Sequence, residues 1–148
     1  MSSNSFTIYN ASAGSGKTYA LAKVYLKIIL ASPQNFRKIL AITFTNKAVN
    51  EMKHRILNSL FEFSKTNSIE NASPLFKDIL NETNYTFVEL PALGKLRLKQ
   101  ILHNYAFFDI STIDKFTHRL IRTFAKDLKI PQNFEVVLDV DLLLQEAV

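Results

Sequence analysis

The positions of apolar residues predict that short strands and longer helices alternate along the first third of the chain. Two short apolar runs, at 6–9 and 38–44, are typical of strands, and the second is nearly continuous, as in a strand buried on both faces of a parallel sheet. Apolar residues at helical spacing follow each run. Those of the two predicted helices are Leu21, Val24, Tyr25 and Ile28, and then Val49, Met52, Ile56 and Leu60. This order favours a right-handed α/β arrangement.

The middle of the chain follows a different pattern. Residues 64–73 are polar and predict a loop, and the segments 74–83 and 93–105 have the spacing of shorter helices. We therefore expect a helical insertion at 64–105, after a core unit at 1–63 that holds the first two strands.

A third strand is predicted at 106–112, and a long helix follows it to residue 128. The apolar face of this helix comprises Ile113, Phe116, Leu120, Ile121, Phe124 and Leu128. Its opposite face carries Lys115, His118, Arg119, Arg122 and Lys126. We assign 106–128 to the core, and 129–148 to the start of a truncated helical subdomain, because the helical pattern continues to the last residue without a stop signal.

Composition adds three limits. The 148 residues suffice for one domain with a real core. There is no cysteine, which excludes disulfides and thiolate metal sites and suits a cytoplasmic location. No apolar run of 18 or more residues is present, so no membrane partner is expected. The formal net charge of +5 is compatible with a polyanionic partner without identifying one.

The segment between the first strand and the first helix has the composition of a phosphate-binding loop. It comprises Ala11, Ser12, Ala13, Gly14, Ser15, Gly16, Lys17 and Thr18. Gly14 and Gly16 allow backbone N–H groups to turn inward around a phosphate, and the next helix begins with its positive dipole end there. Lys17 supplies a cation for the terminal phosphates, and the Thr18 hydroxyl is a ligand of the kind that Mg²⁺ prefers. This arrangement predicts binding of ATP with Mg²⁺.

Two further polar segments, 43–47 and 111–115, follow the second and third strands, where a parallel sheet places its active edge. Hydroxyls, an amide, an aromatic ring and lysines together can hold single-stranded nucleic acid. The alternative is that Thr45 and Thr112 are helix N-caps and that Phe44 belongs to the core. Spacing alone favours this second interpretation.

The three motifs together resemble the opening of UvrD/Rep-type superfamily 1 DNA helicases, with the RecB/AddA branch nearest. They are the loop ending in Thr18, the segment 39–53 and the segment 112–116. The resemblance covers nearly the whole chain but only the first part of a family member. It implies a RecA-like P-loop NTPase fold and ATP-dependent helicase activity in DNA recombination and repair. The partners that it implies are single-stranded DNA or DNA ends, together with a nuclease or helicase subunit.

The resemblance also implies roles for individual residues. The loop residues would bind ATP·Mg²⁺, and Phe44, Thr45, Asn46 and Thr112 would contact the DNA strand. Asp114 stands where the family often has histidine, and we leave it out of the DNA site because a carboxylate repels phosphate.

The groups that complete ATP hydrolysis are not recognisable. An acidic pair after a hydrophobic strand and an arginine finger are required. Asp139 imitates the first, but helix capping is the favoured explanation for it. We therefore identify no catalytic residue and expect the chain alone to bind ATP without hydrolysing it. Two alternatives stay open: a small P-loop kinase and a non-catalytic nucleotide-binding subunit.

Overall fold

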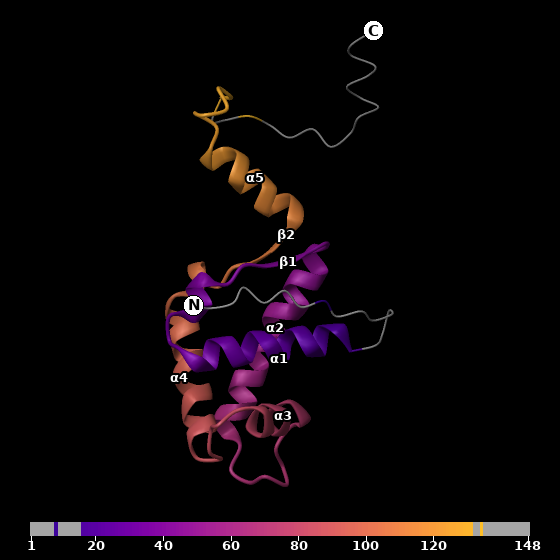
Figure 1. Cartoon of the computed structure of the whole chain (residues 1–148), viewed down its shortest axis with the longest axis vertical. Helices are drawn as coiled ribbons and strands as arrows, with labels where there is room; N and C mark the ends of the chain where they lie inside the picture. Colours follow the sequence, from indigo (N-terminus) through magenta and orange to yellow (C-terminus); the bar gives the residue numbers. More distant parts are fainter. Residues whose placement is uncertain (1–7, 9–15, 132–133, 135–148) are drawn as a thin grey trace.

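The computed structural model describes residue 8, residues 16–131 and residue 134. This part of the chain is a helix-rich α/β arrangement in which a small parallel sheet lies between one helix and four others (Figure 1). The elements in chain order are α1 (Lys17–Ala31), the 3₁₀ turn η1 (Asn35–Lys38), β1 (Ala41–Thr43), α2 (Asn46–Lys65), α3 (Pro74–Glu82), α4 (Glu89–His103), the 3₁₀ turn η2 (Tyr105–Phe107), β2 (Ile110–Thr112) and α5 (Ile113–Thr123).

The sheet pairs the two strands predicted at 38–44 and 106–112. They are parallel, with Ala41 opposite Ile110 and Thr43 opposite Thr112. Both strands are shorter than predicted, and β1 is not buried on both faces, since Ile42 is 43% exposed. Of the strand predicted at 6–9 only Ile8 is described, and it is exposed and outside any strand.

Helix α1 is present as predicted, but only Tyr25 of the four apolar positions that predicted it is buried. The core side comprises Ala22, Tyr25, Leu26, Ile29 and Leu30. Of the predicted face, Leu21 and Ile28 are exposed and line an apolar groove of about 210 Å³ against the β1 strand. The helix is apolar on two sides, and the side that meets α2 and α4 forms the core.

Tyr25 lies at the border of the core and this groove. Its side chain is buried, and its hydroxyl has no hydrogen-bond partner within the described residues. Burial, with a smaller contribution from the nearby Asp109 carboxylate, raises the pKa of this hydroxyl well above its usual range. The ring packs edge-on against Phe108, with centroids 5.9 Å apart. Tyr25 is therefore neutral at physiological pH and acts in packing.

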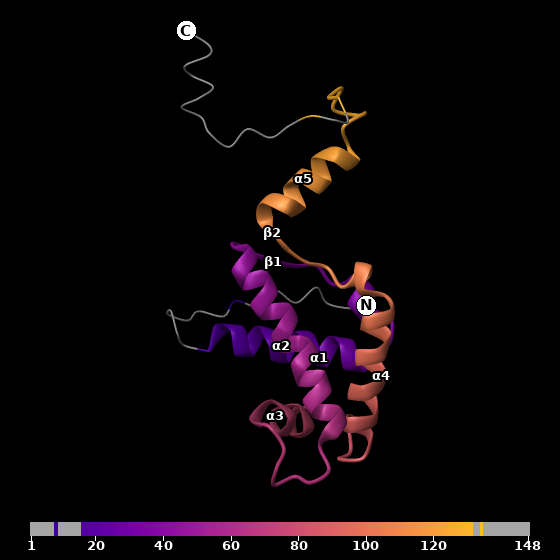
Figure 2. The same ribbon diagram turned by 180° about the vertical axis from the view of Figure 1, so that it is seen from behind.

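Helix α2 forms the centre of the core, and its buried face is the predicted one. Val49, Met52, Ile56 and Leu60 are all buried. Helices α1, α3 and α4 pack around it, and Figure 2 shows α2 crossing α1. Residues of α3 and α4 belong to the same hydrophobic cluster as those of α1 and α2.

Helix α4 begins earlier than predicted because of a capping box. The Glu89 backbone N–H donates to the Thr86 hydroxyl at 3.2 Å, and the Thr86 backbone N–H donates to the Glu89 carboxylate at 2.8 Å. These bonds satisfy donors that are otherwise unpaired at a helix start, and the bond from the Thr86 backbone lowers the pKa of Glu89. The sequence signal for this earlier helix start was the spacing of three residues between Thr86 and Glu89.

Gly94 sets the distance between α4 and α2. A Cβ added there would lie 2.9 Å from the Phe63 Cβ and 3.2 Å from the Leu60 carbonyl oxygen. Helix propensity alone predicts that Gly94→Ala stabilises the chain by about 1 kcal/mol. We expect destabilisation by about 1–3 kcal/mol instead, because the helices must move apart. Denaturant unfolding followed by circular dichroism measures the sign, and a more stable Gly94→Ala variant would show that this contact is not limiting. Ala92→Gly, at an exposed position of α4, measures propensity alone.

Helix α5 differs most from its prediction. It ends at Thr123 instead of 128, and none of its residues is buried. Its apolar positions Ile113, Leu120 and Phe124 are each close to half exposed. Figure 2 shows α5 beyond the strands, on the side opposite the other four helices. The apolar periodicity correctly predicts a helix, but within the described residues no element covers its apolar face.

Candidate nucleotide and nucleic-acid site

The described part of the phosphate-binding loop is its last three residues. Gly16 has φ +83°, a left-handed conformation that a side chain would strain, and it is the N-cap of α1. Lys17 and Thr18 open the helix, and both side chains are exposed. The predicted residues Ala11, Ser12, Ala13, Gly14 and Ser15 lie outside the described residues.

The start of α1 is suited to an anion. The other α-helices begin with a side-chain cap, from Thr45, Ser73, the Thr86–Glu89 pair or Thr112. No side chain among the described residues caps α1, and its first turn contains no acidic residue. Open N–H groups at the positive end of a helix favour phosphate. A magnesium ion there would find the Thr18 hydroxyl as an oxygen ligand.

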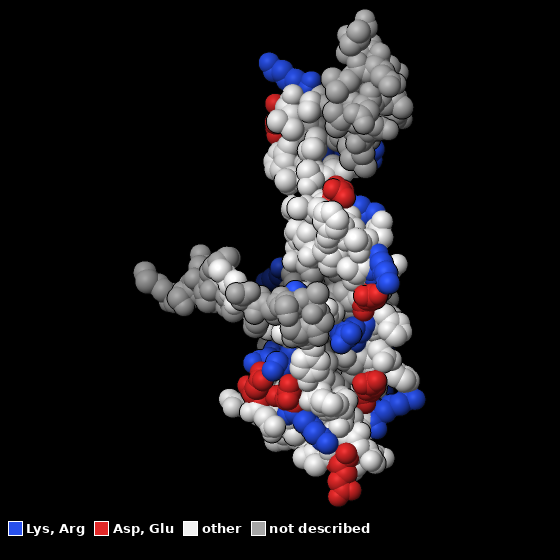
Figure 3. Space-filling model, turned by 90° about the vertical axis from the view of Figure 1, so that its right-hand side faces the viewer, with Lys and Arg blue, Asp and Glu red and all other residues white. Residues whose placement is uncertain are grey.

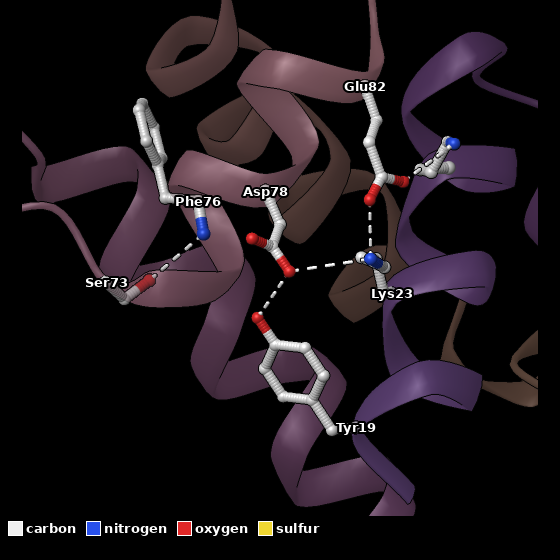
Figure 4. Close-up of polar contacts among 7 residues, drawn as sticks. Tyr19, Lys23, Ser73, Phe76, Asp78 and Glu82 are labelled. Atoms are coloured by element: carbon white, nitrogen blue, oxygen red, sulfur yellow. Dashed lines mark hydrogen bonds and ion pairs between the residues drawn. The ribbon is translucent and has the colours of Figure 1, made fainter. Parts of the chain in front are cut away.

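A polar ladder ties the beginning of α1 to α3 (Figure 4). The Tyr19 hydroxyl donates to the Asp78 carboxylate at 2.9 Å, and Lys23 bridges Asp78 and Glu82. Lys27 reaches the second Glu82 oxygen at 3.2 Å. The hydrogen bonds from Lys23 and Lys27 lower the pKa of Glu82, and the bond to Glu82 raises the pKa of Lys23. The ladder holds α3 beside the residues that follow the loop.

The carboxyl ends of β1 and β2 bring the second and third motifs together. Thr43 and Thr112 are register partners, so Phe44, Thr45 and Asn46 leave β1 beside the start of α5. In Figure 1 these strand ends lie on the right, the same side as the beginning of α1. The motifs that are far apart in sequence therefore end at one edge of the sheet.

The capping interpretation is confirmed for both threonines. The Thr45 hydroxyl accepts from the Ala48 N–H at 3.1 Å, and the Thr112 hydroxyl accepts from the Lys115 N–H at 3.3 Å. Thr112 is moreover 4% exposed. The interpretation of Phe44 as a core residue is wrong, since its side chain is 83% exposed. A large aromatic ring that stands free at this edge is available for stacking on a base.

A polar groove of about 430 Å³ runs between α2 and β2, next to this edge. It is lined by Asn46, Val49, Asn50, Lys53, Ile110, Ser111, Thr112 and Lys115. The lining contains two lysines and no carboxylate. Of these residues, Asn46, Ser111, Thr112 and Lys115 belong to the polar segments 43–47 and 111–115 of the sequence. Asn50 and Lys53 had not been placed in a binding site, and the signal for them was the polar stripe at 46, 50 and 53 on the border of the apolar face of α2.

The basic face of α5 is partly engaged within the chain. Arg119 pairs with Asp109, with its Nη2 2.6 Å from the Oδ2 atom. This hydrogen bond raises the pKa of Arg119. Asp109 precedes β2 instead of lying inside a strand, as the sequence had suggested. Asp114 is exposed in the first turn of α5, where its negative charge interacts favourably with the positive end of the helix dipole.

Charge is not gathered in one large patch on the side of the molecule shown in Figure 3. Basic and acidic groups lie next to one another over its lower half. Within the described residues, no helix is long and apolar enough to cross a membrane, and no group of acidic and histidine side chains could hold a metal ion. Asp139, which imitates the acidic pair in the sequence, lies outside the described residues.

Comparison with known proteins gives a family and a set of relatives. The family model for the UvrD/REP helicase N-terminal domain matches residues 2–147. The RecBCD enzyme subunit RecB of Haemophilus influenzae is 31% identical over 97% of this chain and 13% of its own length. An ATP-dependent helicase/nuclease of the AddA type, from Lactococcus lactis, is 29% identical over 99% of this chain and 10% of its own length. No solved structure matches.

These matches include the residues of all three motifs. The chain spans only about an eighth of the first relative and a tenth of the second. On the family match, which extends over nearly every residue, the chain belongs to the UvrD/REP helicase N-terminal domain family.

Proposed function

We propose that this chain is the N-terminal, ATP-binding part of an ATP-dependent DNA helicase or translocase of the RecB/AddA kind, acting in recombination and repair. The observation that carries the proposal is the parallel register of Thr43 with Thr112. This register brings the segments that follow β1 and β2 to one edge of the sheet. The match to the helicase N-terminal domain family includes both segments.

On this proposal, the phosphates of ATP lie at the beginning of α1. Residues 11–18 surround them, Lys17 neutralises the terminal phosphates, and Thr18 contributes an oxygen to Mg²⁺. The start of α1, which no side chain among the described residues caps, and the left-handed Gly16 support this placement. Hydrolysis needs a carboxylate and an arginine from other segments, so residues 1–148 alone are expected to bind ATP without turnover.

The DNA strand lies at the carboxyl edge on the same proposal. Phe44 stacks on a base, and Asn46 contacts the strand beside it. The Thr45 and Thr112 side chains already cap helices, so their part in DNA contact is chiefly to fix the backbone of this edge. The substrate is single-stranded DNA or a DNA end, in a cytoplasmic protein that works with a nuclease or helicase subunit.

The family match weighs against the two alternatives that the sequence left open. A small P-loop kinase would have no reason to share the segments 39–53 and 112–116 with helicases. A non-catalytic nucleotide-binding subunit would bind ATP but would not hydrolyse it, with or without DNA.

We expect Phe44→Ala to weaken single-stranded DNA binding by about fivefold or more, because one stacked base is lost. Fluorescence anisotropy on the complete protein that carries this chain measures the change. The exposed ring contributes nothing to the core, so unfolding should be unaffected. Phe44→Tyr keeps the ring and is the matched control. Equal affinities of parent and Phe44→Ala would place the strand elsewhere.

A further inference from the structure

A second surface combines basic groups with exposed aromatic rings at the amino ends of the strands. We call it the basic–aromatic patch, and its members are Arg37, Lys53, Tyr105 and Phe107. The turn η1 precedes β1 and η2 precedes β2, so Arg37 and the two rings lie at the sheet edge opposite to Phe44. Tyr105 is 45% exposed and Phe107 52%.

Each ring is paired with a cation. The Arg37 guanidinium carbon lies 4.7 Å from the centroid of the Phe107 ring, and the Arg37 Nη2 atom donates to the Asn104 side chain at 2.7 Å. The Lys53 Nζ atom lies 5.2 Å from the centroid of the Tyr105 ring. A ring held beside a fixed cation offers stacking and phosphate attraction together, the combination that binds single strands.

Lys53 connects the patch to the groove between α2 and β2. It lines the groove together with Asn50 and Lys115, and its ammonium group also faces Tyr105. The groove begins at Asn46 and Thr112 on the opposite edge. The five residues from Thr112 back to Phe107 span at most about 18 Å. A short stretch of nucleic acid can therefore reach from one edge to the other.

From this continuity we propose that the basic–aromatic patch is a second contact surface for single-stranded nucleic acid. The bound strand would run along the groove from Phe44 to Phe107. The inference rests on the proposed function. The chemistry recognised is a phosphate backbone with splayed bases, without base-edge readout, so binding is independent of sequence. The Asp109 carboxylate near this surface is already neutralised by Arg119.

The test is anisotropy on the complete protein with oligothymidylates of about six and about sixteen nucleotides, within the range of single-strand site sizes. Phe107→Ala should weaken binding of the longer strand by about fivefold or more. Arg37→Glu should lower the slope of affinity against salt by about one. The two edges lie within about 18 Å of one another, so the shorter strand also reaches both and its binding should be weakened as well.

Phe107→Tyr, which keeps the ring, and Lys95→Glu, at an exposed position of α4, are the controls and should behave like the parent. Because Phe107 is half exposed, its truncation leaves the fold intact, which circular dichroism checks. If the parent binds the long strand and Phe107→Ala and Arg37→Glu bind it equally well, the patch faces another protein segment and this inference is overturned. If the parent binds neither strand, the proposed function itself fails.

Discussion

Lys17→Ala is expected to lower the affinity for ATP by on the order of a hundredfold and to remove ATP hydrolysis by the complete protein. Lys17 is the first residue of α1, and the positive end of that helix, which no described side chain caps, itself favours phosphate. Removing the cation leaves the charge of the terminal phosphates without its main counter-charge, and loss of one well-placed electrostatic contact typically costs about a hundredfold or more. Isothermal titration with ATP and a phosphate-release assay measure the two effects.

The control for charge is Lys95→Ala, which removes a lysine from an exposed position of α4 and should bind ATP like the parent. Gly16→Ala tests the loop differently. It leaves Lys17 in place but forces a side chain into a left-handed conformation. ATP affinity that is the same in Lys17→Ala and the parent would show that the nucleotide binds elsewhere.

Arg97→Met is expected to destabilise the chain by about 2–5 kcal/mol, because two buried carbonyl groups lose their donors. The Arg97 side chain is buried, and it donates to two backbone carbonyls near the end of α1 and to the Gln100 side-chain oxygen in α4. Its Nε atom donates to the Ile29 carbonyl at 2.8 Å and its Nη2 atom to the Leu30 carbonyl at 3.2 Å. Both carbonyls lie in the last turn of α1, where no intrahelical donor remains. Methionine leaves them buried and unpaired, at a cost of about 1–3 kcal/mol each.

Arg97→Lys separates geometry from charge. Lysine keeps a positive charge at the negative end of α1 but cannot donate from a planar fork to two carbonyls. We expect it to recover only part of the loss. Burial lowers the pKa of Arg97 without neutralising it, so the effect should not change across neutral pH. Denaturant unfolding measures the stability of each variant, and Lys99→Met, at an exposed position of α4, is the control. Equal stability of Arg97→Met and the parent would refute the role of Arg97 in pairing the two carbonyls.

The sequence predicted what depends on short-range signals. The buried face of α2 followed from the spacing of Val49, Met52, Ile56 and Leu60, because one strongly apolar stripe leaves no choice of side. The parallel direction of β1 and β2 followed from the helices that separate the strands. The caps at Thr45 and Thr112 followed from their positions just before a helix.

What failed depends on which surfaces meet in three dimensions. Helix α1 is apolar on two sides, and the spacing of Leu21 and Ile28 predicts the helix without saying that both residues lie outside the core. The amphipathic pattern of α5 predicts a helix but does not say which element, if any, covers it. The groove beside Lys53 exists only because α2 packs on β2, two segments that are far apart in the sequence.

The central claim is that nucleotide and DNA bind beside one another on this sheet, and DNA-stimulated ATP hydrolysis by the complete protein tests it most directly. Phosphate release is measured with and without single-stranded DNA for the parent, Lys17→Ala and Phe44→Ala. We expect that DNA raises the rate in the parent, that Lys17→Ala shows no turnover in either condition, and that Phe44→Ala keeps its basal rate but needs more DNA for stimulation. A parent whose ATP turnover is the same with and without single-stranded DNA would refute the claim.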